Sequence, residues 1–383
     1  MIYLLSLALI LSAMHYYFFL LLIKRGLKRV RSQFTTTSEV PLLTVIIPFR
    51  NESEVILQSL ESIKSQTYPK NRLQVLFVDD MSDDDSYYKL SEAVEEEYID
   101  ILQVPVQRTS KAMKKRAITY ALSFAKGEII VGTDADCLHP TQWLETMVSY
   151  FSENTALVAG PVKFTSGASL FDKIQEIEHA GLTLAGAGLI GAGLPTIASA
   201  ANIAYRKSVF DEVGGFTDNE HLSSGDDELL MQKISRTTTY DIRFCYNSKA
   251  LVTTQPNSSI NQFYQQRKRW ASKGLHYEDI GLIAKLVGIF LYFLLQLTAA
   301  IVIPIAYLLG LAKEGHLVMT ITGLIVKVIT EYAVMREGRP LLYNKIPHKA
   351  FFLAELIHLP YIILAAVAGV LGQFTWKGRK VAR

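Results

Sequence analysis

Residues 128–137, Glu-Ile-Ile-Val-Gly-Thr-Asp-Ala-Asp-Cys, decide the fold class of this chain. Residues 129–131 are apolar and β-branched, which is typical of a buried strand in an α/β sheet, and such sheets bind ligands at the carboxyl ends of their strands. Asp134 and Asp136 follow this strand, and two carboxylates there supply the oxygen ligands that a hard divalent cation prefers. The alternative is that the two acids only cap a helix expected near Pro140.

Apolar segments alternate with helical patterns on both sides of this stretch. The alternation predicts an α/β fold of the Rossmann-like kind, with a mostly parallel, doubly wound sheet. Acids follow two of the strands, at 79–80 and 134–136, and both pairs are expected on one rim of the sheet. Residues 167–195 are rich in Gly, Ala and Leu, which fits either a packed helix or a flexible lid. Strands are expected at 43–48, 75–78, 101–104 and 128–133, with helices up to about residue 66 and over 111–124.

The N-terminal end has the composition of a membrane segment. Residues 2–23 are almost wholly apolar and long enough to span a bilayer. Five basic residues follow within 24–31. The positive-inside rule therefore predicts that the C-terminal end of this apolar segment faces the cytoplasm. We therefore expect a membrane anchor at 1–24 and a cytoplasmic domain at 41–278.

The chain becomes apolar again over 279–376, which predicts a multi-pass protein of the cell membrane. Lys327 and Glu331 make the second of three expected spans unusually polar. Basic residues flank the third span on both sides, so a single crossing there would place positive charge on both faces of the membrane. The topology of this region is therefore left open. The three spans are expected near 283–311, 316–335 and 351–374.

Charge and cysteine content give no support for two classes of ligand, nucleic acid and zinc. The 39 basic and 36 acidic residues give a net charge of +3, which offers no argument for a nucleic-acid partner. The two cysteines, Cys137 and Cys245, are expected to be free thiols in a reducing compartment. No Cys-x-x-Cys or paired His spacing is present, so zinc is not expected.

Several motifs occur in a characteristic order. Together they resemble the membrane-bound branch of the family-2 glycosyltransferases, which has the GT-A fold and carries Q-x-x-R-W before a membrane span. The match covers about residues 41–275. The motifs are Val-Ile-Ile-Pro-Phe-Arg-Asn-Glu at 45–52, Val-Asp-Asp-Met-Ser at 78–82, Asp-Ala-Asp at 134–136, Asn-Ile-Ala-Tyr-Arg at 202–206, Gly-Gly-Phe at 214–216, Gly-Asp-Asp at 225–227 and Gln-Arg-Lys-Arg-Trp at 266–270.

This resemblance implies a site for a nucleotide sugar, with a UDP-sugar as the expected donor. Asp79 or Asp80 would accept a hydrogen bond from a uracil-type base, and Lys114 would lie near the diphosphate, where a positive charge suits the phosphates. Asp134 and Asp136 would hold Mg²⁺ or Mn²⁺, with Asp136 as the direct ligand. The nucleotide-sugar residues implied in this way are Pro48, Arg50, Asn51, Glu52, Asp79, Asp80, Lys114 and Asp134.

The resemblance also implies that Asp227 is the catalytic base. Inverting transfer needs a carboxylate to take the proton of the acceptor hydroxyl as its oxygen attacks the anomeric carbon. The family motif usually reads Glu-Asp and here reads Asp226-Asp227, so Asp226 stays open as the base, and one of the two acids could also cap the next helix. Gln266, Arg269 and Trp270 would form the acceptor end, although their basic helix also fits an interfacial anchor.

The leading functional hypothesis is an inverting glycosyltransferase that moves a sugar from a nucleotide-diphosphate sugar to a membrane lipid acceptor at the cytoplasmic face. One alternative is a processive polysaccharide synthase that extends a glycan acceptor and exports the polymer. An alternative of another class is a transporter whose cytosolic domain senses nucleotides, although few charges lie deep within the expected spans.

Overall fold

The structure of this 383-residue chain is a computed structural model. The start of the helix expected at 111–124 and part of the basic tail after residue 376 lie outside the residues that it describes. It describes residues 2–33, 40–105, 113–220, 222, 225–343, 345–371, 374–376 and 379–381.

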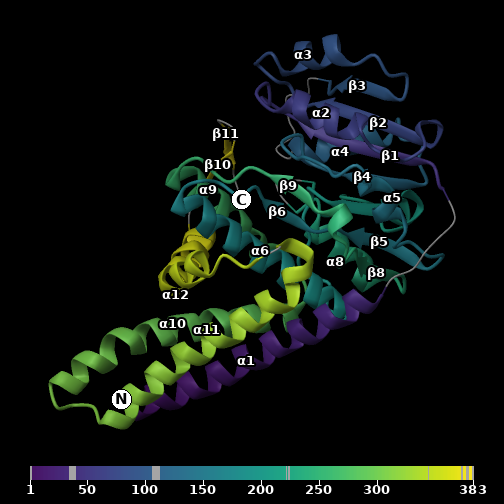
Figure 1. The fold of residues 1–383 in the computed structure, drawn as a ribbon. Coiled ribbons are helices and arrows are strands. Elements are labelled where there is room, and N and C mark those ends of the chain that lie inside the picture. The colour runs from purple at the N-terminus through teal and green to yellow at the C-terminus, as the bar shows by residue number, and fades with distance from the viewer. Residues whose placement is uncertain are drawn as a thin grey trace.

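A seven-stranded sheet forms the centre of the domain, in the order β3-β2-β1-β4-β7-β5-β8 (Figure 1). The first four strands in this order pair in parallel, whereas β7 runs antiparallel to both of its neighbours. Val45 of β1 pairs with Val75 of β2 and Val131 of β4, so these strands end at one edge. The predicted mostly parallel α/β fold is confirmed. The strands are β1 Leu43–Phe49, β2 Leu73–Asp79, β3 Ile99–Gln103, β4 Ile129–Gly132, β5 Thr155–Ala159, β7 Ile203–Arg206 and β8 Asp241–Phe244.

Helices cover both faces of the sheet, because alternate residues of a buried strand point to opposite sides. Val45 and Ile47 of β1 belong to one buried core together with residues of α2, α3 and α5. Ile46, between them, belongs to the opposite core with residues of α4, α6, α7 and α8. The short elements of the domain are α2 Ile56–Lys64, η1 Lys70–Arg72, α3 Ser86–Ala93, α4 Met113–Leu122, α5 Trp143–Val148, α7 Lys207–Glu212, α8 Glu228–Thr237, η2 Ser248–Ala250, η3 Lys273–His276 and the parallel pair β6 Val162–Phe164 and β9 Val252–Thr254.

The Gly- and Ala-rich stretch is a packed helix. This helix, α6 (Leu170–Gly191), lies against α1 (Ile2–Ser32). A Cβ on Gly188 would lie 2.5 Å from the carbonyl oxygen of Ile23, and a Cβ on Gly26 would clash with the backbone of α6. Small residues at such a crossing let two helix backbones touch directly. The core beneath the sheet therefore continues into the first apolar helix, where it includes Leu27.

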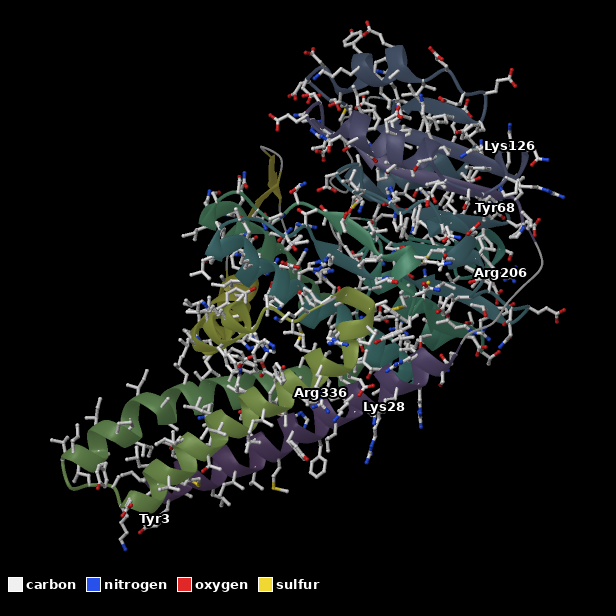
Figure 2. All side chains as sticks on the ribbon, in the orientation of Figure 1. Tyr3, Lys28, Tyr68, Lys126, Arg206 and Arg336 are labelled. Carbon is white, nitrogen blue, oxygen red and sulfur yellow. The ribbon has the colours of Figure 1, made fainter. Side chains whose placement is uncertain are left out.

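Three long helices leave the domain as a bundle: α1, α10 (Ile280–Leu308) and α11 (Glu314–Leu342) (Figure 1). Within the described residues, these three and α12 (His348–Leu371) are the 4 helices long and apolar enough to cross a membrane, which supports membrane association. Figure 2 places Tyr3 at the far tip of the bundle, and Lys28 and Arg336 at the end beside the domain. Lys28 of α1 and Arg336 of α11 therefore lie at the end of the bundle that adjoins the domain.

Helix α12 takes a different direction from the bundle. Figure 1 shows it nearly along its axis, whereas the other three helices run across the view. It starts after α11 has returned to the domain, where the Tyr343 hydroxyl donates to the Glu176 carbonyl oxygen at 3.2 Å. It then packs along α9 (Ile260–Ser272), and a Cβ on Gly369 would contact Ala271. The following hairpin, β10 Phe374–Trp376 and β11 Arg379–Val381, also contacts α9, so both flanks of α12 lie beside the domain.

The two charges of the second expected span are paired inside the helices. Lys327 Nζ lies 3.0 Å from a carboxylate oxygen of Glu331 and 2.6 Å from one of Glu355 in α12. His358 lies 3.2 Å from Glu331, and the Tyr16 hydroxyl donates to the same carboxylate at 2.7 Å. Buried charges persist in such surroundings when they are paired and hydrogen-bonded. The cluster therefore joins α1, α11 and α12.

Lys327→Met should destabilise the protein strongly, because it leaves the carboxylates of Glu331 and Glu355 close together without their cation. Removing one partner of a buried ion pair typically costs about 3–5 kcal/mol in the free energy of unfolding. We expect a clearly lower midpoint of thermal unfolding in detergent. Lys313→Met, at the exposed start of α11, is the control and should leave the midpoint unchanged. Equal midpoints for the two variants would show that the cluster does not hold the helices.

Candidate functional site

A cleft of about 790 Å³ opens where β1 and β4 end. Its walls come from the loops after these strands, from the turn before α8, and from residues 254–273, which include α9. This volume lies in the range of substrate and cofactor sites. The cleft gathers most of the residues predicted from the sequence, namely Pro48, Arg50, Glu52, Asp80, Lys114, Asp134, Asp136, Asp226, Asp227, Gln266, Arg269 and Trp270.

Two predicted residues, Asn51 and Asp79, do not line the cleft and instead shape its edge. Asn51 has a φ of 53°, a left-handed conformation that Asn adopts more readily than most residues, and its side chain bonds to the loop after β2. The buried carboxylate of Asp79 accepts from the Ser82 backbone N–H at 2.9 Å. In the same loops, Arg50 Nη1 donates to the carbonyl oxygen of Asp80 at 2.8 Å. The loops after β1 and β2 are thus tied together.

Lys114 joins two acidic groups from different parts of the chain. Its Nζ lies 2.7 Å from Asp134 Oδ1, after β4, and 2.9 Å from Asp226 Oδ2, before α8. Burial alone would lower the pKa of Lys114, but the two carboxylates raise it well above its ordinary value. The side chain is therefore a permanent positive charge in the middle of the cleft.

Asp134 and Asp136 have the arrangement of a cation site. Together with Cys137 they offer ligand atoms that lie within 4.8 Å of one another. Burial, and then the neighbouring Asp136, raise the pKa of the Cys137 thiol, so the sulfur is neutral at pH 7. The acids do not cap α5, whose N-cap is Gln142. Oxygen ligands of this kind suit a hard divalent cation.

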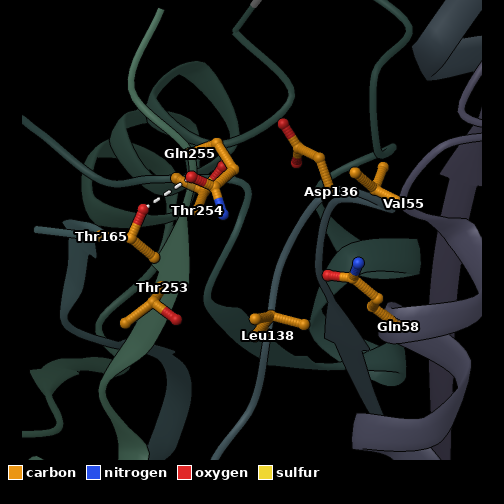
Figure 3. A pocket seen from close by; sticks show the side chains of 8 residues that line it. All are labelled: Val55, Gln58, Asp136, Leu138, Thr165, Thr253, Thr254 and Gln255. Atoms are coloured by element: carbon orange, nitrogen blue, oxygen red, sulfur yellow. Dashed lines mark hydrogen bonds between the residues drawn. The ribbon is translucent and has the colours of Figure 1, made fainter. Parts of the chain in front are cut away.

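A smaller pocket adjoins the cleft and shares Asp136, Thr254 and Gln255 with it (Figure 3). Its volume of about 10 Å³ is close to the room that one water molecule needs. Asp136 lies on one side of this pocket. On the other side, the Thr165 hydroxyl donates to the side-chain oxygen of Gln255 at 2.8 Å. Asp136 therefore faces a wall of hydroxyl and amide groups across this pocket.

Asp226 and Asp227 precede α8 in different surroundings. Asp227 is the N-cap: Oδ1 accepts from the backbone N–H of Glu228 at 2.7 Å, and Oδ2 accepts from that of Ala200 at 2.9 Å. Asp226 Oδ2 pairs closely with Lys114, at 2.9 Å, whereas Asp227 Oδ1 lies 3.8 Å from Lys273 Nζ. Burial raises the pKa of Asp226, but the nearby Lys114 ammonium outweighs it and holds the pKa below its ordinary value. The cap, which the sequence left open, is therefore Asp227.

One buried arginine fastens α9 to α6 and α12. Arg267 Nε donates to Glu178 Oε1 at 2.9 Å, Nη2 donates to the second oxygen, and the Tyr361 hydroxyl also donates to Glu178, at 2.8 Å. The Arg267 guanidinium donates to Gln266 Oε1 at 2.6 Å and lies 4.2 Å from the centre of the Trp270 ring. Gln266 and Trp270 of the Q-x-x-R-W motif thus contact an arginine that a bidentate ion pair with Glu178 keeps in place.

The cleft also contains residues that sequence reasoning missed. The imidazole of His179, from α6, lies 4.4 Å from the Phe164 ring, and burial lowers its pKa to about 4, so it is neutral at pH 7. No local motif marks this histidine. Five of the other additions share a carboxamide group and come from one run beside Q-x-x-R-W, where composition could have revealed them: Gln255, Asn257, Asn261, Gln262 and Gln265.

Comparison with known proteins agrees with this geometry. Residues 44–214 match the family model "Glycosyl transferase family 2". Glycosyltransferase AglE of Haloferax volcanii is 32% identical over 216 residues, which cover 55% of this chain and 66% of the relative. A poly-β-1,6-N-acetyl-D-glucosamine synthase of Staphylococcus epidermidis is 25% identical over 264 residues, which cover 68% of this chain and 60% of the relative. The match thus spans somewhat less than two thirds of these curated relatives.

A solved structure shows the same fold over nearly the whole chain. The mannosyltransferase PcManGT from Pyrobaculum calidifontis, in complex with GDP-Man and Mn²⁺, superposes with a TM-score of 0.59 at 18% sequence identity. The superposition covers 97% of this chain and 99% of the mannosyltransferase. At this level of identity, the likeness establishes a shared architecture.

Proposed function

The chain belongs to the family-2 glycosyltransferases, and from this premise we propose that it transfers a sugar, with inversion, from a nucleotide-diphosphate sugar to a membrane lipid acceptor at the cytoplasmic face. One observation carries the proposal: a single cleft joins an acidic pair, a lysine and a second acidic pair. Family membership favours this enzyme over the transporter hypothesis.

The diphosphate of the donor is proposed to lie at Asp134, Asp136 and Lys114. The two carboxylates fit Mg²⁺ or Mn²⁺, because they offer hard oxygen ligands that lie within 4.8 Å of each other. When bound, such an ion offsets the negative charge that develops on the leaving diphosphate. Lys114 adds a fixed positive charge at the same place. The mannosyltransferase of the same fold holds GDP-Man together with Mn²⁺, which supports this assignment.

The nucleoside is proposed to lie against the loops after β1 and β2. Pro48, Arg50, Glu52 and Asp80 line that side of the cleft, while Asn51 and Asp79 hold the loops in shape. We propose a UDP-sugar as the first donor to test. GDP-mannose is the second, because it is the donor bound in the related structure.

Asp227 is proposed to accept the proton of the acceptor hydroxyl. Each of its two oxygens takes one backbone N–H, which fixes the carboxylate at the cleft wall and leaves further lone pairs. Asp226 is less suited, because its pairing with Lys114 lowers its pKa and makes it a weaker base. As the hydroxyl oxygen attacks the anomeric carbon from one face, the nucleoside diphosphate leaves from the other, and the configuration inverts.

The acceptor is proposed to enter beside α9, where Gln266, Arg269 and Trp270 line the cleft and α12 packs along the helix. An apolar helix next to the site offers a path for a lipid tail. Relatives that include a polysaccharide synthase favour a second candidate, in which the same site extends a polymer. The small helical bundle supports transfer to a lipid over passage of a polymer.

Product analysis tests both the stereochemistry and the choice between these two functions. The purified chain, given an α-linked nucleotide sugar and a membrane lipid extract, should yield a β-linked product, identified by the proton coupling of its anomeric carbon in NMR. Mass spectrometry should show a lipid heavier by one sugar. An α-linked product would exclude inversion, and a ladder of masses would establish the polymerising alternative.

The domain is proposed to face the cytoplasm, because basic residues gather at the end of the bundle beside it (Figure 2). Cys137 and Cys245 are buried, so an added surface cysteine reports orientation with little background. In intact cells, Lys126→Cys should resist a membrane-impermeant maleimide and react only after lysis. Tyr3→Cys, at the opposite tip, should react from outside. Labelling of Lys126→Cys in intact cells would reverse the proposed orientation.

A further inference from the structure

We infer that a row of amide side chains on one wall of the cleft is a saccharide subsite, and that the acceptor lipid already carries at least one sugar. The inference rests on the proposed transfer reaction and adds to it the class of acceptor. The row, called here the amide wall, consists of Gln255, Asn261, Gln262 and Gln266, all of which line the cleft.

Two members of the amide wall are held in a defined orientation. The side-chain oxygen of Gln262 accepts from the backbone N–H and the hydroxyl of Ser258 at 3.2 and 2.8 Å. The oxygen of Gln266 accepts from Arg267 at 2.6 Å and from Asn257 at 2.9 Å. A backbone N–H and a guanidinium only donate, so the oxygen of each amide is identified by its partners. The NH₂ groups of both amides have no partner among the described residues and remain available to a ligand.

The other two members extend the wall toward the acidic pair. Gln255 accepts from Thr165 and lines the small pocket opposite Asp136 (Figure 3). Asn261 is exposed in the first turn of α9 and makes no side-chain hydrogen bond within the described part of the chain. The wall therefore runs from the proposed donor phosphates along the helix that begins at Ile260.

The chemistry of this wall matches a sugar better than a bare phosphate. No member of the amide wall is charged, whereas phosphate sites are built from Arg and Lys. The cations that line the cleft on this side, Arg269 and Lys273, follow the wall in the sequence. Neutral amides donate to and accept from hydroxyl groups. The rings of Trp270 and His179, whose centres lie 6.0 Å apart, add flat apolar surface near the same helix. A ligand with many hydroxyls and weakly polar ring faces satisfies both features.

The position of the wall assigns this sugar to the acceptor. α9 carries three of its four residues and packs along the apolar α12, whereas the proposed diphosphate residues Asp134 and Asp136 follow a strand of the sheet. A saccharide attached to a membrane lipid would reach the amide wall from the side of α12. It would then present a hydroxyl to Asp227.

The test compares two acceptors with the full chain in lipid nanodiscs. One acceptor is polyprenyl phosphate, and the other is polyprenyl diphosphate that carries a disaccharide. The parent chain should prefer the disaccharide lipid. Asn261→Ala and Gln262→Met should each lower kcat/KM for that lipid about three- to tenfold, as expected for one lost neutral hydrogen bond, with the donor KM unchanged. Lys268→Met, on the same helix but outside the cleft lining, is the control and should match the parent.

Two results would overturn the inference while leaving the proposed function intact. One is transfer to polyprenyl phosphate at least as fast as to the disaccharide lipid, and the other is a change confined to the donor KM. Failure of the proposed function is distinguishable, because the parent would then release no nucleoside diphosphate from any donor with either lipid. If no donor is consumed, the binding of the two lipids, measured by thermophoresis, still tests the inference. The inference requires tighter binding of the disaccharide lipid that Asn261→Ala weakens, and equal binding would overturn it.

Discussion

Asp136→Ala should abolish sugar transfer and remove the dependence of nucleotide binding on a divalent cation, while the midpoint of thermal unfolding stays unchanged. Asp136 is exposed, so little packing is lost with its carboxylate. A bound cation supplies several kcal/mol of transition-state stabilisation, and each 1.4 kcal/mol is worth about a factor of ten in rate. The transfer rate should therefore fall about a thousandfold or more.

The measurement pairs transfer assays with calorimetric titration of the nucleoside diphosphate, with and without Mn²⁺. For the parent, affinity should rise when Mn²⁺ is added, whereas the Asp136→Ala titrations with and without the ion should coincide. Asp211→Ala removes an exposed carboxylate outside the cleft and should behave as the parent does. Full turnover of the parent in a chelator would refute the role assigned to the pair.

Asp227→Asn should keep donor binding and lose most transfer. The amide is close to the carboxylate in size but cannot take the proton of the acceptor hydroxyl. Positioned general bases contribute about a hundred- to ten-thousandfold, so kcat should fall within that range with the donor KM little changed. The substitution also acts on stability, because an Asn offers one oxygen to the two backbone N–H groups of Glu228 and Ala200. Loss of part of the cap costs about 0.5–2 kcal/mol.

Two matched variants separate these effects. Asp279→Asn makes the same change at the exposed N-cap of α10, where it should lower stability slightly without lowering kcat. Asp226→Asn keeps the cap of α8 and should reduce kcat less than Asp227→Asn does. If Asp226→Asn is inactive and Asp227→Asn is active, Asp226 is the base. Equal loss of donor binding in both variants would show that Asp226 and Asp227 have a structural role.

Much of the sheet could be predicted because β1, β2 and β4 are short apolar runs with β-branched residues, and β2 and β4 end in an acid or Gly. The strand expected at 128–133 is β4, and the two acids after it lie in the cleft, as the position of ligands in α/β sheets predicts. The packed helix over residues 167–195 could not be distinguished from a lid, because the need for Gly188 and Gly191 becomes visible only at their contact with α1.

Other features depend on contacts that leave no local pattern. Asp226 and Asp227 both satisfy the preference for an N-cap, and only the backbone path shows that Asp227 takes this position. Asp79 belongs to the motif at 78–82, yet its carboxylate accepts a hydrogen bond from the backbone N–H of Ser82 in its own loop. His179 reaches the cleft from α6, a helix that also packs against α1, α12 and β6. These outcomes follow from tertiary packing, which one sequence does not display.

The release of nucleoside diphosphate by the purified full chain tests the central claim most directly. The assay would offer a panel of UDP-sugars and GDP-mannose with Mn²⁺, in the presence and absence of a membrane lipid extract. We predict that one donor is consumed, that the lipid extract stimulates its consumption, and that both EDTA and Asp136→Ala stop it. No release from any donor, or an unchanged rate in EDTA, would contradict a metal-dependent glycosyl transfer in this cleft.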